Sequence, residues 1–141
     1  MPKTYTNRGK FKLTNGTLSS ATKQISAHTG TGPTAAAAAD FNFVSDLVTS
    51  NTEVAVAGYA RAGITSTFTE NDTNDRVDIT WTSPSFGASL AAGATITTVG
   101  CFDSTPATDA TRELLWVDVP ASSIATNGSG ITYTSAADTL T

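Results

Sequence analysis

Apolar and polar residues alternate in short runs along most of the chain, and turn-forming residues separate the runs. The clearest run covers residues 75–84, where Val77, Ile79 and Trp81 share one side of an extended chain and Pro84 closes the run. Alternation with a period of two is typical of a half-buried β-strand. Further alternating runs cover residues 9–16, 52–59, 93–103, 112–120, 129–135 and 138–141. The pattern predicts an all-β chain folded as a sandwich or a barrel. We expect an antiparallel β-sandwich of jelly-roll or immunoglobulin-like type.

The phase of each run predicts which side chains share a face. In residues 112–120, strict alternation places Leu115 and Val117 on one face and Leu114 and Trp116 on the other. Trp116 is therefore predicted either in the core or at an interface.

Residues 40–48 do not follow the alternation. Their apolar side chains recur three or four positions apart, at Phe41, Val44, Leu47 and Val48. This spacing places them on one side of a helix, so a short helix is predicted over residues 40–48.

The first alternating run, residues 9–16, predicts the first strand. Phe11 and Leu13 alternate there with Lys10 and Lys12, and an Asn-Gly pair follows, which is a strong turn signal.

Charge is segregated along the chain. Five of the eight basic residues lie within the first 30 positions, namely Lys3, Arg8, Lys10, Lys12 and Lys23. No acidic residue precedes Asp40, so residues 1–30 carry a charge of +5 and the remainder carries −9. We predict one domain overall, with a basic N-terminal arm and first strand in residues 1–30 and the β-sandwich in residues 31–141. Segregation of this kind points to a charged partner.

The composition favours a structural role over a catalytic one. The chain has 27 Thr and 21 Ala among 141 residues, and only 14% of its residues are charged. Such a composition describes a β-rich chain with small side chains and a weakly charged surface.

Residues that carry catalysis or bind metals are scarce. One cysteine, Cys101, cannot form an internal disulfide, and one histidine, His28, supplies neither a zinc cluster nor a convincing base for a nucleophile. No phosphate-binding or dinucleotide-binding motif occurs. We therefore predict no enzymatic activity, no cofactor and no metal.

An acidic stretch in residues 70–78 suggests calcium binding as an alternative. It contains Glu70, Asp72, Asp75 and Asp78, but its spacing does not match the helix-loop-helix calcium motif. A solvated hairpin turn is the favoured interpretation, because Asn and Asp are ordinary turn residues.

Membranes and nucleic acids are not predicted as partners. No apolar run approaches the roughly 20 residues that cross a bilayer, and the first residues lack the apolar segment of a signal peptide. Synthesis in the cytoplasm is therefore expected. Five dispersed positive charges with few stacking aromatics, beside a remainder of −9, favour binding to nucleic acid only weakly.

From Asp40 onward, the order of motifs resembles a group of structural proteins of tailed bacteriophages and prophages. The matching segments are DFNFVSDLVTSNTEV, GYARAGIT, VDITW, ATITTVGCFD, ELLWVDVP and GITYTSAADTLT. The first 39 residues match less well, so nothing about the basic arm is inferred from the resemblance. It implies a compact β-sandwich in the virion, a small protein that decorates or cements the head shell and has no catalytic residues.

Together these observations predict a capsid decoration protein at the virion head surface, whose partners are the major capsid protein and further copies of itself. The residues predicted to contact a partner are Lys3, Arg8, Lys10, Lys12 and Trp116. The alternative is an adhesion module on the tail or head that binds a host glycan or protein.

Overall fold

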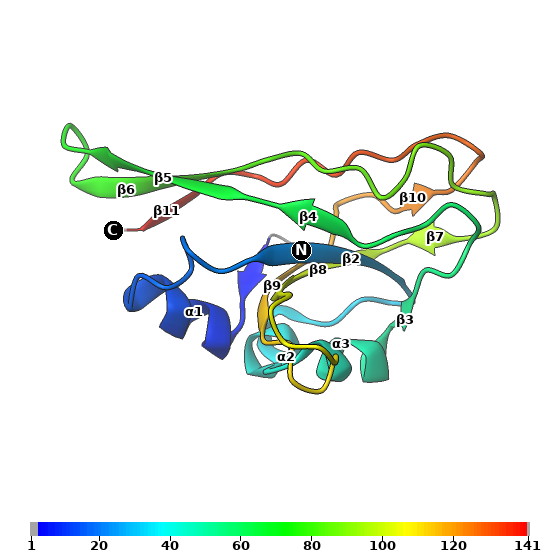
Figure 1. Ribbon diagram of the computed structural model, residues 1–141, viewed down its shortest axis with the longest axis horizontal. Helices are drawn as coiled ribbons and strands as arrows, with labels where there is room; N and C mark the ends of the chain where they lie inside the picture. The colour runs from blue at the N-terminus through cyan, green and yellow to red at the C-terminus, as the bar shows by residue number, and fades with distance from the viewer. Residues whose placement is uncertain (1–2, 141) are drawn as a thin grey trace.

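The computed structural model describes residues 3–140 and consists mainly of antiparallel strands (Figure 1). β-Structure takes up 35% of these residues and helices take up 15%, which confirms an all-β chain with few helices. The main sheet has the order β1 (Thr4–Tyr5), β9 (Leu114–Asp118), β8 (Thr98–Asp103), β2 (Lys23–Thr29) and β3 (Thr52–Glu53), and β4 (Ala62–Ile64) also pairs with β2.

Two smaller sheets lie over one face of the main sheet (Figure 1). One has the order β11 (Asp138–Leu140), β6 (Arg76–Trp81) and β5 (Ser66–Asn71), and the other pairs β10 (Ile124–Ala125) with β7 (Thr95–Ile96). The helices α1 (Asn7–Thr14), α2 (Ala35–Asp40) and α3 (Val44–Ser50) lie on the opposite side of the main sheet (Figure 1).

The main sheet is therefore covered on both faces, and a hydrophobic cluster lies on each. The larger cluster includes Ile25, Val99 and Trp116, while Phe102 and Val117 belong to the smaller cluster with residues of α2 and α3. All six residues of β8 are buried as a result.

A β-bulge changes the predicted phase of β9. Cys101 lies opposite Trp116, but Phe102 lies opposite Leu114, so Leu115 is the extra residue on this strand. Leu115 and Trp116 consequently enter the same cluster, and strict alternation was wrong for this pair.

The N-terminal segment differs most from the prediction. Residues 9–16 were predicted to be a strand, but α1 covers Asn7–Thr14. Residues 4–29 are also not a separate arm, because β1 pairs with β9 and β2 lies inside the main sheet. Met1 and Pro2 lie outside the described residues.

Other predictions hold in part. The helix predicted over residues 40–48 is replaced by α2 and α3, which an extended break at residues 41–43 separates. Residues 52–59 contribute only the two residues of β3, and residues 129–135 form an isolated bridge between Ser85 and Thr132 instead of a strand. The strands predicted in residues 75–84, 93–103 and 112–120 are confirmed.

Candidate functional site

Helix α1 packs closely against strand β9 of the main sheet. Thr6 caps its first turn, since the Thr6 hydroxyl accepts a hydrogen bond from Gly9 N at 3.0 Å. Gly9 is buried against β9, and a Cβ atom at this position would lie only 1.8 Å from the carbonyl oxygen of Leu115. Close contact at Gly9 therefore determines which side of the helix faces outward.

The outward side of α1 carries an exposed aromatic residue between two cations. Phe11 is 64% exposed, and the side chains of Arg8 and Lys10 are also exposed. At 100° per residue, Arg8 and Lys10 lie on either side of Phe11 around the helix. We call these three residues the α1 face. Strand alternation placed Phe11 on the face opposite Lys10 and Lys12, and Phe11 was not among the residues predicted to contact a partner.

Arg8 is anchored to the body of the protein. Its guanidinium lies 5.6 Å from the centre of the Phe43 ring and 3.4 Å from a carboxylate oxygen of Glu113. These contacts orient the side chain without removing it from solvent.

Two other N-terminal basic residues, Lys3 and Lys12, form ion pairs within the chain. Lys3 Nζ lies 2.6 Å from Asp138, Lys12 Nζ lies 2.5 Å from Asp103, and the side chain of Lys3 is only 4% exposed. Lys12 Nζ also lies 2.9 Å from Glu113. The structure thus corrects the view that Lys3 and Lys12 reach outward, and it leaves Arg8 and Lys10 accessible.

Trp116 is fully buried at 0% exposure, so its ring cannot contact a partner in this structure. It packs edge-on against Trp81, with ring centres 5.5 Å apart, and stacks against Tyr133 at 6.1 Å. The core interpretation of Trp116 is correct and the interface interpretation is wrong.

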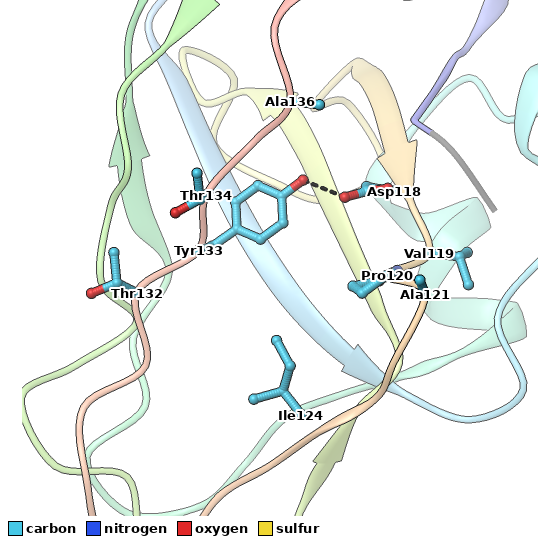
Figure 2. A pocket seen from close by; sticks show the side chains of 9 residues that line it. All are labelled: Asp118, Val119, Pro120, Ala121, Ile124, Thr132, Tyr133, Thr134 and Ala136. Atoms are coloured by element: carbon cyan, nitrogen blue, oxygen red, sulfur yellow. Dashed lines mark hydrogen bonds between the residues drawn. The ribbon is translucent and has the colours of Figure 1, made fainter.

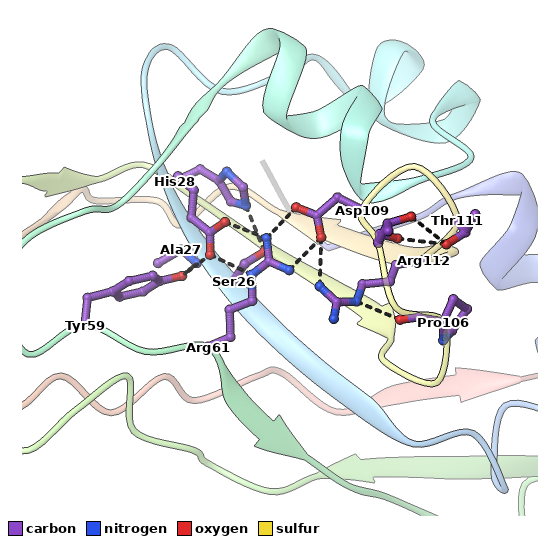
Figure 3. A network of polar contacts seen from close by, with 11 residues as sticks. Ser26, Ala27, His28, Tyr59, Arg61, Pro106, Asp109, Thr111 and Arg112 are labelled. Carbon is purple, nitrogen blue, oxygen red and sulfur yellow. Dashed lines mark hydrogen bonds and ion pairs between the residues drawn. The ribbon is translucent and has the colours of Figure 1, made fainter.

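A second charged cluster centres on Arg61 (Figure 3). Its guanidinium donates to both carboxylate oxygens of Glu53 and to both of Asp109, at 2.6–2.8 Å. Arg112 also donates to Asp109, at 2.9 Å, and Tyr59 donates to Glu53 at the same distance.

Both carboxylates of this cluster accept hydrogen bonds from their neighbours, and these bonds favour the ionised form. Hydrogen bonds from Arg61, together with those from Arg112, lower the pKa of Asp109 to about 2 despite partial burial. Burial opposes ionisation of Glu53, yet its pKa is also lowered, because Arg61 and Tyr59 donate to the carboxylate. No local sequence pattern indicates this cluster, since Arg61 and Asp109, which bond directly, lie 48 residues apart.

Ser26 and His28 lie on the same side of β2, and Ser26 Oγ is 2.8 Å from His28 Nε2 (Figure 3). Both residues are 0% exposed. Burial lowers the pKa of His28, so the imidazole is neutral at neutral pH. A serine nucleophile and its histidine base must contact a substrate. Ser26 and His28 are enclosed by the protein in this structure, so a substrate does not reach them.

An open pocket of about 510 Å³ lies between the end of β9 and the C-terminal segment (Figure 2). Tyr133 donates from its hydroxyl to Asp118 Oδ2 at 2.6 Å, and burial raises the pKa of this hydroxyl. Thr132, Thr134 and Ile124 are among the other residues of the pocket's mixed polar and apolar lining.

The acidic stretch in residues 70–78 forms the end of the β5–β6 hairpin, which confirms the hairpin interpretation. Within residues 3–140, no group of three or more His, Cys, Asp and Glu side chains is arranged to hold a metal ion. None of the helices described is long and apolar enough to cross a membrane.

Comparison with known proteins gives no further guide to the site: no family model, curated protein or solved structure matches this chain.

Proposed function

We propose that this protein is a non-enzymatic structural protein of a phage particle. It decorates the outer surface of the capsid, acts as a small homo-oligomer and stabilises the head by bridging neighbouring capsid subunits. In this proposal the fold is a β-sandwich, with the main sheet as one layer and the β11–β6–β5 and β10–β7 sheets as the other.

The observation that carries the proposal is the α1 face. Aromatic residues and arginine are enriched at the centres of protein interfaces, and a large exposed apolar side chain on a rigid element is a natural anchor. Phe11 is such a side chain, and Arg8 and Lys10 flank it with positive charge. An acidic protein surface, such as that of many capsid shells, is the complementary partner.

Multivalency explains how the small α1 face can hold the protein on a capsid. Three residues provide modest affinity alone, but many copies on one lattice, each joined to others, bind with much greater avidity. The charged residues then contribute mainly to the rate and orientation of association.

The experiment is a binding assay on purified heads that lack the protein. Phe11→Ala should lower occupancy at least tenfold, and Lys10→Glu should lower it more at low salt than at high salt. Val48→Ala is the matched control, because Val48 is also an exposed apolar residue, at 39%, but lies on α3. Equal binding by the Phe11 variant and the control would overturn the proposal.

Adhesion to a host glycan is the second candidate, and the pocket beside Tyr133 favours it. A carboxylate, a tyrosine ring and threonine hydroxyls around an open cavity are suited to sugar hydroxyls and to the apolar face of a sugar ring. Tyr133→Phe would then reduce binding to host envelope material while leaving binding to heads unchanged.

A further inference from the structure

Strand β5 is the outermost strand of its sheet, whose order is β11–β6–β5. Thr82 N donates to the carbonyl oxygen of Thr65 at 3.0 Å, so the backbone groups of Thr65 point toward β6. Because these groups alternate along an antiparallel strand, those of Ser66, Phe68 and Glu70 point the other way.

The chain itself does not continue a strand along that side. Lys23, the first residue of β2, pairs with Ile64, just before β5 begins. The preceding residues turn away, and Ala21 N donates to the carbonyl oxygen of Thr17 instead of pairing with Ser66. Figure 1 shows β4 and β5 as one continuous ribbon, in which β5 extends beyond the start of β2.

The open side of β5 lacks the lysine, proline and bulge that commonly protect an edge strand, and Glu70 is its one charged residue. Natural edges are commonly blocked by lysine, proline or a bulge. Residues 66–71 contain no lysine and no proline, and their pairing with β6 is regular from Ser66 to Asn71. Phe68, at the middle of the strand, is only half-buried.

A cavity of about 530 Å³ lies where this open side meets the body of the protein. Lys23 is the charged residue in its lining, and the Lys23 ammonium donates to the carbonyl oxygens of Leu18 and Ala21 at 2.8 and 2.9 Å. Neither acceptor carries a full charge, so the Lys23 side chain, although only 5% exposed, gives the lining one positive charge.

The hairpin that β5 begins is acidic. Glu70, Asp72, Asp75 and Asp78 carry four negative charges, whereas Arg76 carries one positive charge and is paired with Asp78 at 2.7 Å. The acidic turn of one chain therefore complements the Lys23 cavity of another.

We propose that two copies of this chain pair through β5 as an antiparallel two-fold dimer. Phe68 of each copy lies at the axis, Ser66 of one copy faces Glu70 of the other, and each acidic turn approaches the Lys23 cavity of the opposite copy. This register places no like charges opposite each other, and it is self-complementary, as a two-fold interface must be. The dimer gives the homo-oligomer of the proposed function a specific interface, and it holds whether or not the protein binds a capsid.

The first test is sedimentation equilibrium of the full chain over a wide concentration range. The wild type should form dimers, and Glu70→Pro should weaken dimerisation at least tenfold, because proline removes a donor that faces the partner. Glu70→Gln keeps that donor and is the matched control. A wild type that stays monomeric throughout, or a Glu70→Pro variant that dimerises as well as the control, overturns the proposal.

A double variant tests how much the acidic turn contributes to dimerisation. Asp72→Asn combined with Asp75→Asn should raise the dimer dissociation constant about threefold to tenfold, and the effect should shrink in high salt. Asparagine suits position 75, where φ is +47°. Asp40→Asn, a neutralisation of an exposed residue on α2, should have no effect.

A disulfide experiment tests the register without depending on a destabilising change. The register places position 67 of one copy directly opposite position 69 of the other, at the close spacing that a disulfide accepts. A mixture of the Thr67→Cys and Thr69→Cys proteins should therefore cross-link on mild oxidation. Efficient cross-linking of either variant alone, with no mixed disulfide between positions 67 and 69 in the mixture, would contradict this register.

Discussion

Lys3 and Asp138, which lie 135 residues apart in the chain, form an ion pair of 2.6 Å. The same oxygen of Asp138 accepts hydrogen bonds from Tyr5 and from Trp81 Nε1, each at 2.8 Å. One carboxylate therefore fastens the N-terminal segment to β6 and β11, across the two layers.

Loss of this carboxylate should be more damaging than loss of the lysine. Asp138→Ala leaves a buried ammonium without its counter-ion and should lower the free energy of unfolding by about 3–5 kcal/mol. Lys3→Met leaves Asp138 with two donors and should cost about 1–2 kcal/mol. Urea titrations of both variants measure the difference, and equal losses would contradict this account of the pair.

Gly9 should be intolerant of a side chain although it lies in a helix. Alanine normally stabilises a helix relative to glycine, but at position 9 its Cβ would collide with the backbone of Leu115. We expect Gly9→Ala to lose about 1–3 kcal/mol of stability. Gly63→Ala is the control, since a Cβ there meets nothing within 4 Å, and thermal unfolding of both variants checks the contrast.

The Arg61 cluster should make the protein sensitive to acid. Asp109 has a pKa of about 2 in the folded state and about 4 when unfolded. Its contribution to stability is present above pH 4 and is lost as the pH falls toward 2. Chemical unfolding between pH 5 and pH 2 should show this loss, and Asp109→Asn should flatten it. If the stability of Asp109→Asn falls with pH as steeply as that of the wild type, other carboxylates dominate the acid sensitivity.

His28 is the single histidine of the chain, so its titration can be followed by NMR without overlap from other imidazoles. Since burial lowers the pKa of His28, its ring protons in NMR spectra should titrate below the ordinary value of about 6.5. The unfolded chain then binds a proton that the folded chain does not, so stability should decline as the pH falls below about 6.5. A resonance that titrates at or above 6.5 would contradict the burial of this side chain.

Local pattern predicted the strands whose alternation was uninterrupted. Val77 and Ile79 in β6 and Val99 and Cys101 in β8 alternate without a break, and these strands occur where they were expected. The β2 strand was not predicted although Ile25 and Ala27 alternate with polar neighbours, and the structure buries the polar Ser26 and His28 of this strand as well.

The errors arose where tertiary contacts decide the local structure. Residues 9–16 alternate like a strand, but Thr6 supplies a cap and Gly9 permits close contact with β9, so a helix forms. The α1 face depends on that outcome, as does the exposure of Phe11. The Arg61 cluster depends on strand pairing between distant segments, which no local pattern encodes.

The most direct test of the central claim is the copy number of the protein in purified particles, measured by quantitative mass spectrometry against the major capsid protein. A capsid decoration protein should be present in a simple ratio to capsid subunits, at hundreds of copies per head. A few copies per particle would place it in the tail, the collar or a fibre, and its absence from particles would contradict the proposed function.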